Sequence, residues 1–126
     1  MVNYAYNQQF SPPAPFVHVT LRCQETAEEI ADLPAELDYA ADRTVIPEHL
    51  AEHLKLLPLD EIPVGAFGGQ VMLLRTYRVE LTIRKCQTKV VEVIAHSKEP
   101  FILLGRDILN LYRVILDGPK LALQIE

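Results

Sequence analysis

The segment LDYAADRTVIP, from Leu37 to Pro47, holds the residue with the clearest chemical potential. Asp38 follows an apolar edge directly and could be one half of a catalytic carboxylate pair. Two carboxylates held close together share one proton, because they cannot both ionise cheaply, and such a pair supplies an acid and a base. A chain of 126 residues is too short for two independent lobes, so a symmetric pair requires a second copy of the chain.

A second candidate is the segment HLAEH, residues 49–53, which spells the H-x-x-E-H pattern of some zinc peptidases. On a helix this spacing places two imidazoles on one face, with a glutamate between them. Catalytic zinc needs three protein ligands and an open position, and no second helix with a suitably placed acid is evident. The alternative is the solvated face of an amphipathic helix that buries Leu50 and Leu54.

Composition excludes several classes of protein. With 49% hydrophobic and 23% charged residues, the chain has the make-up of one ordinary globular domain. A net charge of -5 without a basic stripe argues against a nucleic-acid partner. Neither a signal peptide nor a segment of membrane-spanning length is visible, so we expect a cytoplasmic protein without a membrane partner. In that compartment Cys23 and Cys86 are expected to be reduced.

The elements that must position Asp38 are mostly strands. Residues 1–14 are expected to be an extended tail, because they are polar, aromatic and proline-rich, and residues 15–126 to be the folded domain. One helix is predicted after Pro47, with Leu50, Leu54 and Leu57 on one face, and a short one after Gly105. Alternating or β-branched apolar residues predict strands at 15–23, 73–83 and 89–96, and hairpins around 62–71 and 117–119.

The order of these motifs resembles the retroviral-type aspartic proteases and their bacterial relatives. The family signature is Asp-Thr/Ser-Gly-Ala-Asp. The residues that fit this signature and its flanks are Leu37, Asp38, Ala41, Asp42, Thr44, Val45 and Ile46. Two positions depart from it, because Tyr39 stands where Thr or Ser belongs and Ala40 where Gly belongs. The resemblance covers residues 15–126 and implies a mostly β, single-lobe fold with one or two short helices.

Two further motifs carry the resemblance. Residues 102–107, ILLGRD, look like the family's second motif, in which an apolar pair and Gly105 cross under the active-site loop while Arg106 pairs with Asp42. Residues 64–71, VGAFGGQV, are similar to the flap that closes over substrate, and the implied contacts are Gly65, Ala66, Phe67, Gly68 and Gly69. The simpler alternatives are a structural ion pair and an ordinary glycine-rich hairpin.

The resemblance implies an aspartic endopeptidase that acts on peptide or protein substrates without a metal or other cofactor. Asp38 from each subunit of a homodimer would meet on the two-fold axis, with Ala40 and Asp42 near the substrate backbone. Gly105 and Arg106 would give structural support. The closing segment LALQIE, residues 121–126, resembles the strands that join family dimers, and is expected to be an exposed edge.

The two departures open a second interpretation. The family Thr hydroxyl reaches across the dimer axis, and a Tyr39 ring is too large to repeat that contact. A misplacement of about 1 Å can cost on the order of 100-fold in rate. Ala40 adds a methyl group where the backbone approaches substrate, at a higher cost if its φ is positive. The alternative function is therefore an inactive protease-fold module that dimerises or binds an extended peptide.

Overall fold

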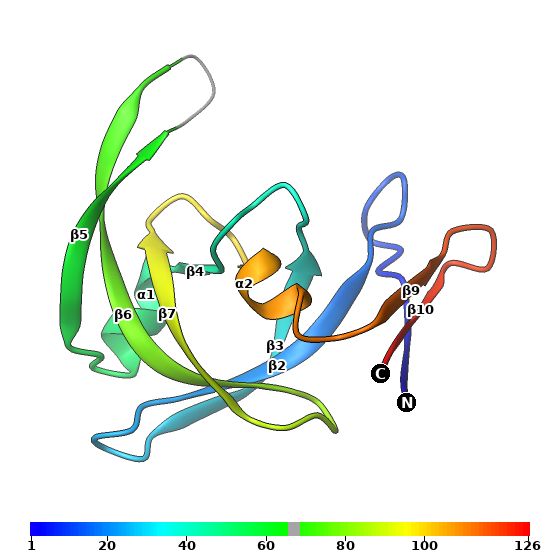
Figure 1. Ribbon diagram of the computed structural model, residues 1–126, viewed down its shortest axis with the longest axis horizontal. Helices are drawn as coiled ribbons and strands as arrows, with labels where there is room; N and C mark the ends of the chain where they lie inside the picture. Colours follow the sequence, from blue (N-terminus) through cyan, green and yellow to red (C-terminus); the bar gives the residue numbers. More distant parts are fainter. Residues whose placement is uncertain (66–68) are drawn as a thin grey trace.

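The computed structural model describes residues 1–65 and 69–126. Ten strands and two short helices are present in these residues, which confirms the mostly β fold with one or two short helices (Figure 1). The larger sheet contains β2 (Phe16–Arg22), β3 (Glu29–Leu37), β4 (Val45–Pro47), β5 (Pro58–Gly65), β6 (Val71–Ile83), β7 (Lys89–His96) and β8 (Ile102–Leu104). The smaller sheet contains β1 (Val2–Ala5), β9 (Val114–Asp117) and β10 (Ala122–Ile125), and the helices are α1 (Glu48–His53) and α2 (Arg106–Leu109).

The larger sheet closes on itself. Its strand order is β2-β3-β8-β4-β7-β6-β5, and β2 also pairs with β6 in antiparallel register, from Val19 opposite Ile83 to Arg22 opposite Glu80. This second pairing leaves no open edge on β2 and encloses the core. The hairpin of β5 and β6 then extends beyond the closed part and stands away from it in Figure 1.

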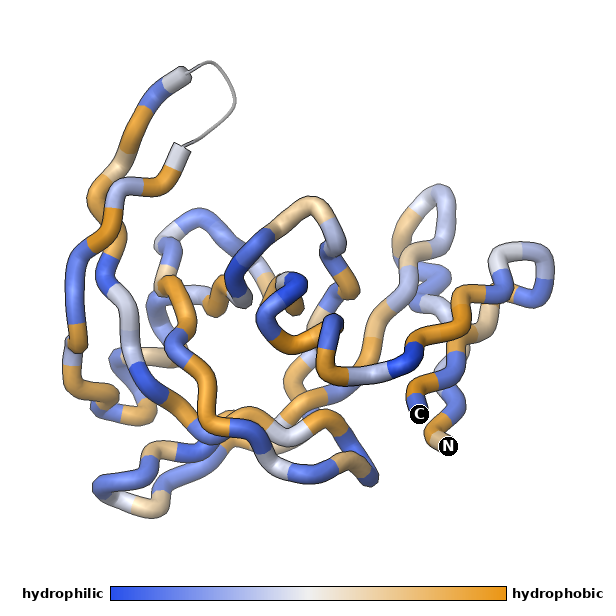
Figure 2. Tube along the Cα trace, viewed as in Figure 1, coloured by the Kyte–Doolittle hydropathy of each residue, from blue (hydrophilic) through white to orange (hydrophobic). Residues whose placement is uncertain are grey.

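The core follows from period-two alternation along the strands. On β2 the side chains of Val17, Val19 and Leu21 are buried, as the alternating pattern predicted. The C-terminal half of β6 alternates in the same way, and the side chains of Val79 and Leu81 are buried. Figure 2 shows the resulting apolar stretches along these strands. Each fully buried Val or Leu side chain stabilises the fold by about 1.5–3 kcal/mol.

The predicted helix is present as α1, directly after Pro47. Leu50 and Leu54 are buried, as predicted. The placement of Leu57 on the same face is wrong, because its side chain is 67% exposed. The helix ends at His53, and Lys55 has a φ of 53°, which turns the chain before Leu57 is reached. No helix within the described residues is long and apolar enough to cross a membrane.

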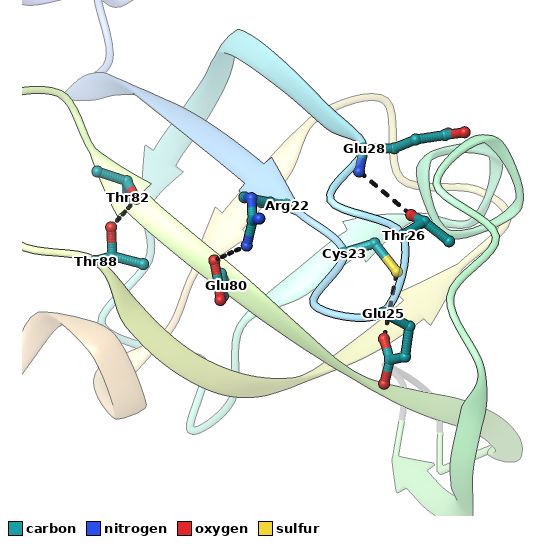
Figure 3. A network of polar contacts seen from close by, with 8 residues as sticks. All are labelled: Arg22, Cys23, Glu25, Thr26, Glu28, Glu80, Thr82 and Thr88. Atoms are coloured by element: carbon teal, nitrogen blue, oxygen red, sulfur yellow. Dashed lines mark hydrogen bonds and ion pairs between the residues drawn. The ribbon is translucent and has the colours of Figure 1, made fainter.

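Polar contacts lie within and between the β2–β3 and β6–β7 hairpins (Figure 3). Arg22 on β2 forms an ion pair of 2.9 Å with Glu80 on β6. The hydroxyls of Thr82 and Thr88 share a hydrogen bond of 2.7 Å, which joins β6 to the start of β7. Cys23 is buried, and its thiol donates to Glu25 at 3.3 Å, so it is a free thiol, as is Cys86.

The two chain ends meet in the smaller sheet. Within residues 1–14, expected to be an extended tail, β1 pairs with β10 from Val2 opposite Ile125 to Ala5 opposite Ala122. Because β9 pairs with the other side of β10, the strand order is β1-β10-β9. The prediction that the closing strand is an exposed edge is therefore wrong. Both edges of β10 are occupied by strands of the same chain, and the outer strands are β1 and β9.

Candidate active site

The loop that carries Asp38 joins β3 to β4 and is held by the segment that passes between these strands. Strand β8 pairs in parallel with β3, from Ala35 opposite Ile102 to Leu37 opposite Leu104, and contacts β4 on its other side. The Asp38 amide donates to the Leu104 carbonyl at 2.9 Å. The start of the loop is therefore fixed to the centre of the sheet.

Gly105 lies against the back of this loop. A Cβ atom at this position would lie 2.5 Å from the carbonyl carbon of Arg43 and 2.7 Å from its oxygen. The φ of Gly105 is -87°, which any residue can adopt. The position therefore requires glycine because of the close approach of two backbones, and not because of its conformation.

A buried hydroxyl connects the loop to α2. Thr44 has no exposed surface, and its hydroxyl donates to the Asp107 carboxylate at 2.7 Å while accepting the Gly105 amide at 3.1 Å. The Thr44 amide donates to the other carboxylate oxygen at 3.0 Å. Sequence analysis gave Asp107 no role, although the motif that it ends was recognised. The contact lies between residues far apart in the chain, so only the motif order could have indicated it.

Arg106 supports the loop in a way that the resemblance did not imply. Its guanidinium Nη1 donates to the Tyr39 carbonyl at 2.6 Å, and its amide donates to the Ala41 carbonyl at 2.9 Å. Among the described residues, no ion pair joins Arg106 to Asp42, which is exposed. In this single chain the implied Asp42–Arg106 pair is thus replaced by a bond from Arg106 to the loop backbone.

Asp38 itself is half-buried and starts a tight turn. Its carboxylate oxygen Oδ1 accepts the Ala40 amide at 3.1 Å, and its carbonyl accepts the Ala41 amide at 3.2 Å. Ala40 does not have a positive φ, so alanine replaces the family glycine without backbone strain. Tyr39 is 42% exposed, and partial burial raises the pKa of its phenol above the usual value.

A cavity of ≈ 460 Å³ lies between this loop and the hairpin of β5 and β6. Asp38, Ala40 and Gly65 all line it, so the fold brings together three of the predicted site residues. Asp42 and Gly69 do not contribute to the lining that the structure describes, and Ala66, Phe67 and Gly68 lie outside the described residues. Other hairpin residues that line the cavity are Val64, Met72 and Leu74.

The hairpin has the features of a covering arm. Its last pair in the described part joins Gly65 to Val71, and Gly69 has a φ of 79°, which favours glycine. Val71 and Leu73 are 67% and 68% exposed, and Met72 is 40% exposed. Exposed apolar side chains on both faces of a hairpin mark a surface that binds a partner or ligand. Of these three residues, Met72 lines the cavity.

Two further residues line the cavity, His96 and Glu99, and the sequence analysis did not predict either of them. His96 ends β7, and Glu99 follows it in a tight turn, where the Glu99 amide donates to the His96 carbonyl at 3.4 Å. The His96 ring nitrogen Nδ1 accepts the Lys98 amide at 3.0 Å. Both side chains line the cavity that contains Asp38. In the sequence, only their position just before the ILLGRD motif, residues 102–107, could have indicated that they belong to the site.

Carboxylates gather at this end of the cavity. The pKa of Glu36 on β3 is raised, first by burial and then by repulsion from Asp38 and Glu99. In the described residues none of these three carboxylates takes part in an ion pair. The end of the cavity beside Asp38 therefore has an excess of negative charge that the chain itself does not neutralise.

Among the described residues, the fold brings no further ligand to the alternative zinc site at His49 and His53. His49 and His53 are exposed on α1. Over residues 1–65 and 69–126, no group of three or more His, Cys, Asp or Glu side chains is arranged to hold a metal ion. The described residues around α1 match the solvated face of an amphipathic helix, whose buried side contains Leu50 and Leu54.

The crossing of β8 between β3 and β4, the aspartate loop and the overhanging hairpin are those of a retropepsin-like aspartic protease fold. Solved structures agree. The chain is similar to a retropepsin-like aspartic protease from Rickettsia conorii, with a TM-score of 0.68 and 14% identity over 98% of this chain and 88% of that one. It is also similar to EIAV protease in complex with the inhibitor HBY-793, with a TM-score of 0.54 and 23% identity over 85% of this chain and 92% of that one.

A third similar structure is the retroviral protease-like domain of Ddi1 from Leishmania major. Its TM-score is 0.51 and its identity is 13%, over 88% of each chain. No protein-family model matches the sequence, and no curated protein matches it. At these identities the likeness establishes a retropepsin-like fold.

Proposed function

We propose that this protein is an aspartic endopeptidase that acts as a homodimer, with one catalytic Asp38 from each chain. The observation that carries the proposal is the position of Asp38, whose carboxylate lies in a cavity between a rigidly supported loop and an overhanging hairpin. One chain supplies one such carboxylate in a single lobe, and a two-fold axis at the loop would supply the second. The partner would be a peptide or protein substrate.

The chemistry follows from a carboxylate pair that shares one proton. The ionised Asp38 takes a proton from a water molecule, whose oxygen attacks the carbonyl carbon of the scissile peptide bond. The protonated Asp38 of the other chain donates its proton to the carbonyl oxygen. Collapse of the tetrahedral intermediate returns a hydroxyl proton to the second Asp38 and breaks the C–N bond, while the leaving nitrogen takes the proton that the first Asp38 received from water. The step needs no cofactor and no metal.

The hairpin of β5 and β6 would act as the flap of this enzyme. An extended substrate has its own unpaired backbone N–H and C=O groups, which a glycine-rich hairpin can bind as an added strand. Within the proposed flap, Gly65 lines the cavity and Gly69 has the positive φ of a hairpin tip. Ala40 and Asp42 would contact the substrate backbone on the other side, and Gly105 and Arg106 would hold the loop from behind.

The second candidate function is a peptide-binding or dimerisation module that no longer cuts. Tyr39 favours it, since a ring that is 42% exposed beside Asp38 must be accommodated wherever two loops meet. Exchange of Tyr39 for Thr together with Ala40 for Gly separates the two functions. A large gain in cleavage would identify these side chains as a block, whereas cleavage by the unaltered chain that continues at the same rate after the exchange would show that the loop works as it stands.

The cytoplasm is the proposed location. It is supported by Cys23 and Cys86, which are both free thiols in the structure, as expected in a reducing compartment. A measurement that checks it is fractionation of cells that express the chain.

The experiment that tests the proposed activity is the digestion of a peptide library from about pH 3 to 7, the range in which a carboxylate pair shares one proton. The chain is compared with its Asp38→Asn variant, and sedimentation measures the oligomeric state of both. Cleavage by the first and not by the second supports an aspartic peptidase. Equal absence of cleavage by a dimer would favour the binding module, and cleavage that survives in Asp38→Asn would exclude Asp38 as the catalytic residue.

A further inference from the structure

The cavity that contains Asp38 is lined by both apolar and polar residues. Val45 and Ile94 are among the apolar ones. His96, at the end of β7, and Glu99, in the turn that follows, are among the polar ones. A binding site of this kind favours a side chain that has an apolar stem and a polar end.

The two carboxylates among the lining residues give the cavity negative charge. Among the described lining residues there is no lysine or arginine, while Asp38 and Glu99 both contribute carboxylates. The neighbouring Lys98 is exposed and uses its backbone amide to bond His96, and it forms no ion pair with Glu99 in the part of the chain that the structure describes. Repulsion from Asp38 and Glu99 also reaches Glu36, whose pKa is raised by burial and then by these two groups.

We infer that Glu99 is a specificity-determining residue that selects peptides with a lysine or arginine in the part of the substrate next to Asp38. The aliphatic stem of that residue would pack on Val45 and Ile94, and its cationic end would lie beside Glu99. An acidic substrate residue at the same place would be rejected by repulsion from the same carboxylate. This inference rests on the proposed function, because it concerns substrate choice in the same cavity.

The turn that presents Glu99 is well defined. The hydrogen bonds from the Glu99 amide to the His96 carbonyl and from the Lys98 amide to the His96 ring fix the backbone between the two wall residues. Phe101, two residues further along, packs on Phe16 and Phe10 with ring centroids 5.0 Å and 5.6 Å away. Because the backbone of this turn is held at both ends, only the Glu99 side chain has to be ordered when it binds a cation, which lowers the entropic cost of binding.

The test uses binding and cleavage in parallel. Binding is measured by fluorescence anisotropy with labelled extended peptides that carry one lysine, one norleucine or one glutamate at each position in turn. Norleucine keeps the stem of lysine and removes its charge. The proteins are the Asp38→Asn chain, which binds without cutting, and the same chain with Glu99→Gln or Glu99→Lys, at about pH 6, where glutamate is ionised. Glu28→Gln is the charge-matched control, because Glu28 is exposed in the β2–β3 turn and its side chain has no partner in Figure 3.

We expect the lysine peptide to bind about threefold to tenfold more tightly than the norleucine peptide, as a partly exposed ion pair allows. The preference should disappear in Glu99→Gln, reverse toward glutamate in Glu99→Lys, and persist in Glu28→Gln. In the wild-type chain the peptide-library digestion should show lysine and arginine enriched near the cut, with the enrichment lost in Glu99→Gln.

The outcomes separate the two proposals. Cleavage without a cationic preference, or with one that Glu99→Gln leaves unchanged, overturns the role of Glu99 and leaves the peptidase intact. Absence of cleavage together with a Glu99-dependent preference for lysine over norleucine overturns the peptidase and supports Glu99 as the selector of a binding cleft. Absence of any difference between the lysine and norleucine peptides in binding overturns the inference by itself.

Discussion

The close approach of Gly105 to the aspartate loop predicts a large effect for Gly105→Ala. The new Cβ would lie 2.5 Å from the carbonyl carbon of Arg43, whereas ordinary contact begins at 3.4 Å. Relief of the clash therefore requires a shift of 3.4 - 2.5 = 0.9 Å between two backbones. Because the Gly105 amide also donates to the Thr44 hydroxyl at 3.1 Å, the shift weakens a buried hydrogen bond as well.

The expected cost has a stability part and an activity part. Overpacking of this kind lowers the free energy of unfolding by about 1–3 kcal/mol. The aspartate loop takes up part of this shift, so Asp38 moves by less than 0.9 Å, and a misplacement that approaches 1 Å reduces catalysis by up to roughly 100-fold. Urea unfolding measures the first effect, and peptide cleavage by the folded fraction measures the second.

The matched control is Gly118→Ala. Gly118 lies in the turn between β9 and β10, it does not have a positive φ, and a Cβ there meets nothing within 4 Å. The free energy of unfolding of Gly118→Ala should lie within about 0.5 kcal/mol of the wild-type value. If Gly105→Ala matched this control in both stability and cleavage, the reasoning that the loop rests directly on Gly105 would be refuted.

Three further variants test other parts of the structure. Thr44→Val removes the hydroxyl bonded to Asp107 and should lower the free energy of unfolding by about 1–3 kcal/mol, because the buried partners of that hydroxyl lose their hydrogen bond. Thr44→Ser keeps the hydroxyl and should retain most of the wild-type stability when both variants are unfolded in urea. Phe10→Ala removes ring contacts with Phe16 and Phe101, and should cost about 1–3 kcal/mol in the same assay, with Phe10→Leu milder. The raised pKa of Glu36, caused first by burial, means that the folded chain binds this proton more tightly than the unfolded chain. Stability should therefore fall as the pH rises from 4.5, the ordinary pKa of glutamate, through the raised pKa of Glu36, and Glu36→Gln should remove that part of the pH profile; a profile unchanged by Glu36→Gln would contradict this role of Glu36.

Local patterns determined most of the secondary structure. The alternation on β2, the proline before α1 and the glycine-containing turn after Asp117 depend on neighbours within a few residues, so they can be read from the chain alone. The position of Asp38 after a buried strand is likewise a local feature. Leu57 was misplaced because a helical pattern was extended past the point at which Lys55 turns the chain.

Pairing between distant segments decided the rest. The neighbours of β10 depend on the path of both chain ends. The strand that was expected at an edge is therefore the central strand of the smaller sheet. Arg106 reaches the Tyr39 carbonyl, and Glu99 joins Asp38 in one cavity, only because β8 passes between β3 and β4. The sequence by itself therefore determined strands β2, β6 and β7, helix α1 and the turn after Asp117, since these follow from short-range preferences, and the order of the motifs indicated the candidate aspartate; strand β1 was not predicted. The tertiary structure alone decided the walls of the cavity and its charge, since these depend on contacts between residues up to 67 positions apart.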